Sequence, residues 1–167
     1  MLGLSFESFV LLHTLISIVA IVTGLIALVA MLRGESPDWV THVFLATTAL
    51  TTITGFMFSI TSFTPALGTG IVSTVLLIPA LAGLYAFHLA GHWRWIYVTT
   101  AIAALWLNCF VLVVQSFQKL PELFELAPTQ SEPPFLIAQA AVLAAFVWAG
   151  WRAVQRFHPP VLAAARA

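Results

Sequence analysis

The sequence predicts an all-α protein, a polytopic transmembrane helix bundle with five spans that forms a single domain over residues 1–167. Three observations predict this class. Hydrophobic residues make up 61% of the chain and charged residues only 7%, against about 25% charged residues in soluble proteins. Uncharged stretches of about 20 residues recur along the chain, and this is the length that a helix needs to cross a bilayer. Basic residues also gather on one side of the expected spans.

The uncharged stretches define the expected elements in chain order. Their continuity favours helices, because membrane strands would alternate apolar and polar residues over about ten positions. One stretch is long enough for two crossings, and proline and glycine residues at 64–70 (TPALGTG) predict a turn that divides it. The expected spans are residues 9–32, 39–63, 70–90, 95–117 and 135–154.

The longest expected connection is the outer loop at residues 118–134. It contains four prolines and is too polar to cross a membrane. Its apolar residues Leu120, Leu123, Phe124 and Leu126 are compatible with a short amphipathic segment on the membrane surface. A plain covering loop is the alternative.

The orientation follows from the positions of the basic residues. With five spans, every arginine falls on one side, whereas the other side carries Lys119 and several glutamates. Because lysine and arginine are enriched in cytoplasmic loops, the N-terminus is expected outside the cytoplasm and the C-terminus inside. The arginines are Arg33, Arg94, Arg152, Arg156 and Arg166, and tryptophans gather near them at Trp39, Trp93, Trp95, Trp148 and Trp151.

Composition and motifs exclude several functions. Six basic and six acidic residues leave no positive excess for nucleic acid phosphates, so no nucleic acid partner is expected. The single cysteine, Cys109, cannot form an intramolecular disulfide or a cysteine-rich zinc site. The chain has no Ser–His–Asp arrangement, phosphate-binding loop or HExxH motif, so an enzyme is not expected and no catalytic residue is assigned.

Two segments carry a resemblance to known proteins. Residues 44–56 (FLATTALTTITGF) and 126–135 (LAPTQSEPPF) resemble a group of small, uncharacterised bacterial inner-membrane proteins of similar length. The resemblance extends over most of the chain. It implies a multi-pass protein of the bacterial inner (plasma) membrane, with the lipid bilayer as its surroundings. It implies no activity and no functional residues.

Polar side chains recur at similar depth near the outer ends of the expected spans. Histidine and amide groups in hydrocarbon are costly unless they are paired, so they are expected to converge inside the bundle. They could line an outer-leaflet pocket for a small or lipophilic ligand in a transport, sensing or accessory protein. Alternatively, they form interhelical hydrogen bonds worth about 0.6 kcal/mol each. The residues are His13, Ser17, Ser59, Asn108, Gln115, Gln118 and Gln139, with Glu132 at the mouth.

A second polar group lies at the expected cytoplasmic ends of spans two and three. His42 and His88 could clamp a haem b iron in an electron-transferring cytochrome. With His92 they could instead bind a metal ion, or all three could be ordinary interfacial histidines. No cofactor is expected apart from this haem alternative. The third functional alternative is a non-catalytic assembly or interaction subunit, whose protein partners the sequence does not identify.

Overall fold

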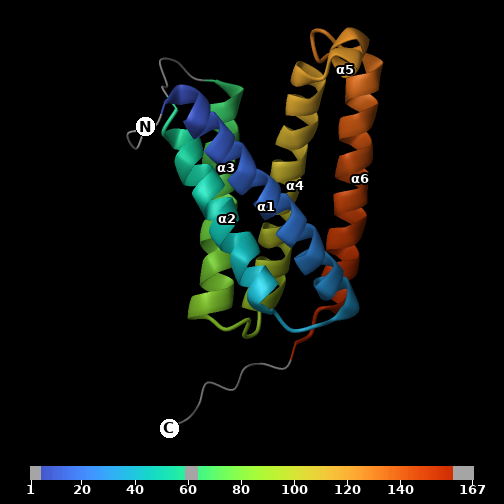
Figure 1. Ribbon diagram of the computed structural model, residues 1–167. Coiled ribbons are helices and arrows are strands. Elements are labelled where there is room, and N and C mark those ends of the chain that lie inside the picture. The colour runs from blue at the N-terminus through green and yellow to red at the C-terminus, as the bar shows by residue number, and fades with distance from the viewer. Residues whose placement is uncertain (1–4, 59–63, 160–167) are drawn as a thin grey trace.

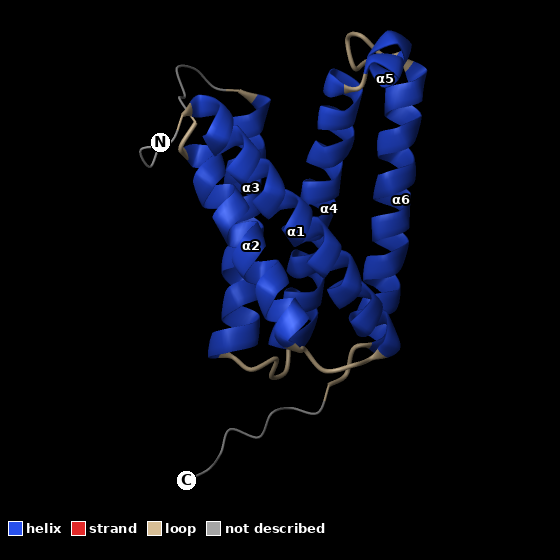
Figure 2. Cartoon of the chain, viewed as in Figure 1, coloured by secondary structure: helices blue, strands red, loops and turns tan. Residues whose placement is uncertain are grey.

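The computed structural model describes residues 5–58 and 64–159, and within these ranges the chain forms helices and no strands. Five long helices alternate in direction (Figure 1), and the helix ends that carry Arg33, Arg94 and Arg156 lie together at one end of the bundle, the arginine-bearing end. Figure 2 shows the short connections between them. The elements are α1 (Phe6–Arg33), α2 (Trp39–Phe56), α3 (Pro65–Leu81), the π-helix η1 (Ala82–Ala86), α4 (Trp93–Lys119), α5 (Pro121–Leu126) and α6 (Pro133–Arg156).

Four of the described helices are long and apolar enough to cross a membrane. They are α1, α3 continued by η1, α4 and α6. The 18-residue α2 is not among them, because threonines and His42 make it more polar than its neighbours. The all-helical class is confirmed and the protein has the character of a membrane protein, whereas the fifth span and the orientation stay predictions.

The first helix is longer than expected at its N-terminal end. It begins at Phe6 rather than at residue 9, because the Ser5 hydroxyl accepts a hydrogen bond from the Ser8 N–H and caps the first turn. It ends at Gly34, whose φ of 75° is left-handed. A Cβ at Gly34 would also lie 2.9 Å from the Arg156 carbonyl oxygen, so glycine suits this position on both counts.

The expected boundary between spans two and three is wrong. Helix α2 ends at Phe56 instead of residue 63, and α3 begins at Pro65 instead of residue 70. Pro65 starts the helix because proline suits the first helical position, where no N–H is needed, and the Thr64 hydroxyl caps the turn. Gly70 therefore lies inside α3, where a Cβ would come within 3.1 Å of the Phe56 ring.

The C-terminal end of α3 departs from an α-helix. Pro79 lacks an N–H, and the π-helix η1 follows three residues later. The Phe87 N–H donates to the Ala82 carbonyl at 2.9 Å and the Leu89 N–H to the Gly83 carbonyl at 2.8 Å. The chain then turns through His88 (φ 46°) and Leu89 (φ 61°), so the span ends before the expected residue 90.

The remaining spans extend beyond their expected ends. Helix α4 begins at Trp93 and α6 begins at Pro133, whereas starts at residues 95 and 135 were expected. The connection between them contains α5, so the short segment expected in the outer loop is helical. Its position relative to a membrane surface stays a prediction.

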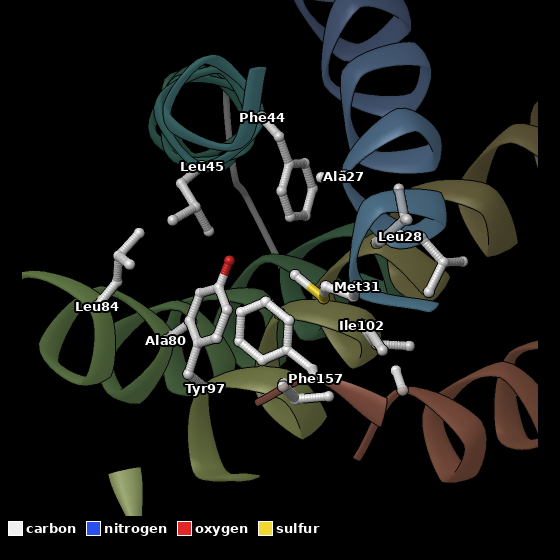
Figure 3. Packing of buried hydrophobic residues seen from close by; sticks show 14 of the residues in the cluster. Ala27, Leu28, Met31, Phe44, Leu45, Ala80, Leu84, Tyr97, Ile102 and Phe157 are labelled. Atoms are coloured by element: carbon white, nitrogen blue, oxygen red, sulfur yellow. The ribbon is translucent and has the colours of Figure 1, made fainter. Parts of the chain in front are cut away.

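The main hydrophobic core lies at the arginine-bearing end of the bundle. Figure 3 shows the rings of Phe44, Tyr97 and Phe157 packed among aliphatic side chains from several helices. A smaller cluster of Phe117, Ala127 and Phe135 joins α4, α5 and α6 at the opposite end. Between these clusters α4 and α6 diverge from α1, α2 and α3 (Figure 1), so the two groups of helices are held together mainly at one end.

Candidate functional site

The outer polar residues of α1 bond to α2. The Nδ1 atom of His13 lies 2.8 Å from the Thr54 hydroxyl oxygen. That hydroxyl has one proton, which it donates to the Leu50 carbonyl at 2.7 Å, so its oxygen accepts from Nδ1–H of His13. One turn deeper, Ser17 donates to the His13 carbonyl at 2.8 Å and lies 3.3 Å from the Thr51 hydroxyl. The face of α1 that carries His13 and Ser17 therefore turns toward α2, as expected.

The amides of α4 and α6 form separate contacts. The Asn108 side chain donates to the Thr48 hydroxyl of α2 at 3.2 Å. The Gln139 side chain donates to the Phe110 carbonyl of α4 at 3.2 Å, and its own amide oxygen is buried without a partner among the described residues. Both amides thus contribute to helix pairing, but Gln139 keeps one unused acceptor.

The remaining outer residues lie at the surface. Gln115 is exposed and has no hydrogen-bond partner in the described ranges. Gln118 donates to the Gln130 side chain at 3.4 Å, within the hairpin of α4, α5 and α6. The expected residue Ser59 lies outside the described residues. The expected convergence of His13, Asn108 and Gln115 inside the bundle is therefore not seen, because His13 bonds to Thr54, Asn108 bonds to Thr48 and Gln115 is exposed.

Glu132 organises its own loop. Its carboxylate accepts hydrogen bonds from the Thr129 hydroxyl at 2.8 Å, the Thr129 N–H at 3.1 Å and the Ser131 N–H at 3.0 Å. Desolvation raises the pKa of this carboxyl, but the hydrogen bonds outweigh that effect and leave the pKa below its ordinary value. The charged Glu132 carboxylate thus stabilises its own loop next to the N-terminus of α6.

A pocket of about 190 Å³ lies at the opposite, arginine-bearing end. Both inner histidines line it, so the structure brings together His42 and His88, which the sequence placed on adjacent spans at matching depth. The α1–α2 loop, α2, η1 and the chain after α6 all contribute to its wall. The lining residues are Ser36, Pro37, His42, Leu84, Tyr85, His88, Leu89 and Pro159.

A histidine–tyrosine pair forms the polar part of this pocket. The Nδ1 atom of His42 lies 2.7 Å from the Tyr85 hydroxyl oxygen, and the ring centroids are 5.5 Å apart. The hydrogen bond leaves the Nε2 atom of His42 without a partner among the described residues. His42 is exposed, so this ring nitrogen is accessible to a ligand in the pocket.

The π-helix positions the other half of the pocket. Gly83 in η1 packs so closely on α4 that a Cβ would lie 3.1 Å from Tyr97 Cβ and 3.2 Å from the Trp93 carbonyl. The positive φ of His88 and of the buried Leu89 costs on the order of 1–3 kcal/mol each, and such backbone outliers cluster at functional sites. A π-helix is also common at such sites.

The third histidine does not join this pocket. His92 is exposed at the N-cap of α4 and does not line the cavity. Among residues 5–58 and 64–159, no three His, Cys, Asp or Glu side chains lie close enough together to hold a metal ion. The three-histidine metal alternative stays a prediction, and in the described structure His92 lies apart from the pocket that His42 and His88 line.

Sequence reasoning missed the partners of the polar residues. Tyr85 carried no signal beyond its position one turn before His88, because neither helical spacing nor a motif connects it to His42. The threonines of α2 were likewise not assigned to any polar partner. In the structure Thr48, Thr51 and Thr54 lie within hydrogen-bond distance of Asn108, Ser17 and His13.

The chain matches no protein-family model, no curated protein and no solved structure. The resemblance to small bacterial inner-membrane proteins therefore stays a prediction. Any function has to be inferred from the geometry of the two polar regions.

Proposed function

We propose that this is a five-span protein of the bacterial inner membrane, with its N-terminus outside and its C-terminus inside the cytoplasm. The alternating direction of the five long helices supports this topology, since α2 packs against α1, α3 and α4, three of the four helices that could span a membrane (Figure 1). Arginines at the ends of α1, α4 and α6 support the orientation. In this topology the pocket lies near the cytoplasmic membrane surface.

The function we propose is the binding of a small lipophilic molecule in the pocket that His42, Tyr85 and His88 line. The observation that carries this proposal is the pocket itself, a mostly apolar cavity with a few convergent polar groups, which is the usual character of a ligand site. Exposed Trp39 and Trp95 at the same end of the helices match an interfacial position.

Mass spectrometry of molecules that remain bound to the protein purified in mild detergent tests this function. Ser36 lines the pocket from an exposed loop, so Ser36→Trp should fill the cavity without disturbing the core. We expect a small molecule to accompany the parent protein and to be lost from Ser36→Trp. The neighbouring Glu35→Trp adds the same side chain outside the pocket and should retain the molecule. Equal retention in both variants would place the binding elsewhere.

Haem b is the alternative occupant, because two histidines line one pocket. Bound haem would supply one-electron transfer, and His42 and His88 would hold its iron. The cavity of about 190 Å³ favours a smaller occupant, since sites for drug-sized ligands already measure about 300–1,000 Å³. An absorption spectrum of protein from haem-producing cells, recorded before and after reduction, distinguishes haem b from a smaller lipophilic ligand. A stoichiometric Soret band that shifts on reduction would favour haem.

The outer polar region is a second candidate ligand site because the buried oxygen of Gln139 has no partner in the described structure. A ligand that donates a hydrogen bond there would satisfy it. Gln139→Leu should then abolish ligand binding and leave the folded yield unchanged. Loss of yield alone would assign Gln139 to helix pairing.

A further inference from the structure

We propose that the pocket binds the headgroup of a quinone, a neutral six-membered ring with two carbonyl oxygens and a hydrocarbon tail. This inference rests on the proposed lipophilic-ligand function and names the class of ligand. The polar groups that would recognise the ring are His42, Tyr85 and His88.

The charge of the pocket favours a neutral ligand. Its eight lining residues include no Lys, Arg, Asp or Glu. A phosphate or carboxylate headgroup would enter without a Lys or Arg partner, and an uncompensated charge in a partly apolar site is costly. The only titratable groups on the wall are His42, His88 and Tyr85. A ligand with neutral oxygen atoms is therefore favoured over an anionic lipid headgroup.

The shape of the pocket favours a small ring with a tail. Leu84, Leu89 and two prolines supply apolar wall, which suits the faces of a flat ring. The volume of about 190 Å³ is below that of sites for drug-sized ligands. A hydrocarbon tail would leave past Tyr85, which is 49% exposed and lies at the end of the candidate span Pro65–Ala86.

The hydrogen bond between His42 and Tyr85 leaves one proton available for the ligand. A neutral histidine has one N–H and tyrosine has one O–H, and their mutual hydrogen bond uses one of these two protons. If Tyr85 donates to Nδ1, the Nε2–H of His42 remains free. If Nδ1–H donates to Tyr85, the tyrosine O–H remains free. In either tautomer the pair can donate to a carbonyl oxygen.

The same pair suits the reduced ring. A quinol hydroxyl donates, and in the tautomer with the proton on Nδ1 the unprotonated Nε2 of His42 can accept. A change in the tautomer of His42 thus lets the His42–Tyr85 pair either donate to a quinone carbonyl or accept from a quinol hydroxyl. The oxidised and reduced rings should therefore bind with similar affinity. The proposal concerns binding and includes no electron-transfer step.

Calorimetric titration of the full-length protein in phosphatidylcholine nanodiscs with decylubiquinone, and then with its quinol, tests the assignment. We expect saturable binding of both forms at one site. Tyr85→Phe keeps the ring and removes the hydroxyl, so it should weaken binding about five- to tenfold, as for one neutral hydrogen bond. His42→Ala should weaken binding more strongly. His92→Ala is the matched control, because this histidine lies at the same end but outside the pocket.

Three results would overturn the quinone assignment. The first is the absence of saturable binding to the folded protein, and the second is unchanged affinity in both Tyr85→Phe and Ser36→Trp. The third is a loss of affinity in His92→Ala equal to that in Tyr85→Phe. If His42→Ala does not fold, the binding affinities of Tyr85→Phe and Ser36→Trp decide whether the quinone assignment holds. If decylubiquinone does not bind but another molecule is still lost on Ser36→Trp, the ligand class is wrong and the lipophilic-ligand function stands.

Discussion

Single hydroxyl groups on α2 connect three neighbouring helices. Thr54 accepts from His13 of α1, Thr48 accepts from Asn108 of α4, and Thr52 lies 3.1 Å from Ser73 of α3. Thr54 and Thr52 also donate within their own helix, to the Leu50 carbonyl at 2.7 Å and to the Thr48 carbonyl at 2.9 Å. Threonine is therefore useful at these positions because it pairs with a polar neighbour without leaving its own proton unsatisfied.

The hydrogen bonds by which the Glu132 carboxylate stabilises its loop should depend on pH. Its folded-state pKa lies below the unfolded value of about 4.3. Its hydrogen bonds therefore contribute fully above that pH and are lost as the pH falls through the lower folded value. The amide NMR signals of Thr129 and Ser131 should stay constant from pH 7 to 5 and move below about pH 4. Glu132→Gln should abolish this titration, and a midpoint above the ordinary glutamate value would contradict the assignment.

Gly24 marks a close approach between α1, α2 and α4. A Cβ there would lie 2.8 Å from Cδ2 of Phe44 and closer still to Cδ1 of Leu105. We expect Gly24→Ala to destabilise the protein by about 1–3 kcal/mol through overpacking, which thermal denaturation in nanodiscs would measure. Gly150→Ala is the matched control, since its Cβ would meet Ile102 at an ordinary 3.8 Å. A loss of stability in Gly150→Ala as large as in Gly24→Ala would contradict this explanation.

At the scale of helices, two arginines secure the inner ends. The guanidinium of Arg94 at the start of α4 donates to the Val154 carbonyl at 2.9 Å and to the Phe157 carbonyl at 2.8 Å. These are carbonyls at the end of α6, which have no partner within the helix and lie at the negative end of its dipole. Arg156 reaches the Leu32 carbonyl at the end of α1, 3.4 Å away. The same residues that indicate orientation thus also join helices.

Removing the Arg94 contacts should loosen the end of α6. Arg94→Met keeps an apolar stem but loses both hydrogen bonds, each worth about 1.5–3 kcal/mol before screening by solvent. We expect faster hydrogen exchange at residues 153–157 and a net loss of about 1–3 kcal/mol in unfolding free energy. Arg33→Met is the control, because Arg33 is exposed and its nearest acid, Glu35, lies 3.8 Å away. Equal exchange in the two variants would show that the Arg94 contacts do not hold α6.

For the whole molecule, the uneven distribution of buried residues is the main feature. The large core joins all the long helices at the arginine-bearing end, whereas the small cluster at the other end joins only α4, α5 and α6. The hairpin formed by these last three elements therefore diverges from α1, α2 and α3 (Figure 1). This shape places the compact pocket at one end and the separated outer polar pairs at the other.

The five-span topology makes a clear prediction for labelling from outside. Single cysteines at Glu7, Ser131, Glu35 and Gly91, in a Cys109→Ser background, would be treated with an impermeant maleimide on intact spheroplasts. Positions 7 and 131 should label at once, whereas positions 35 and 91 should label only after permeabilisation. A topology in which α2 does not cross would instead put position 35 on the same side as position 131.

Much of the fold was predictable because it depends on local properties of the chain. Long uncharged runs predicted α1, α4 and α6 to within a few residues, and the inward face of His13 and Ser17 followed from helical spacing. The boundary between α2 and α3 was not predictable from the TPALGTG run, because proline and glycine favour a turn and also the first turn of a helix. The cap by Thr64 decides between these two outcomes.

The candidate site, like the fold, was predictable from the sequence only in part. Composition and charge pattern by themselves determined a helical, membrane-type protein, and matching depth on adjacent spans was enough to pair His42 with His88. Only the tertiary structure decided that Tyr85 bonds to His42, that Gln115 stays exposed and that the outer polar residues form separate pairs. The physical reason is that composition and period act within one helix, whereas partners depend on how helices cross and where they diverge. Those crossings follow from close contacts at Gly24 and Gly83 and from the π-helix, none of which has a local signature in the sequence.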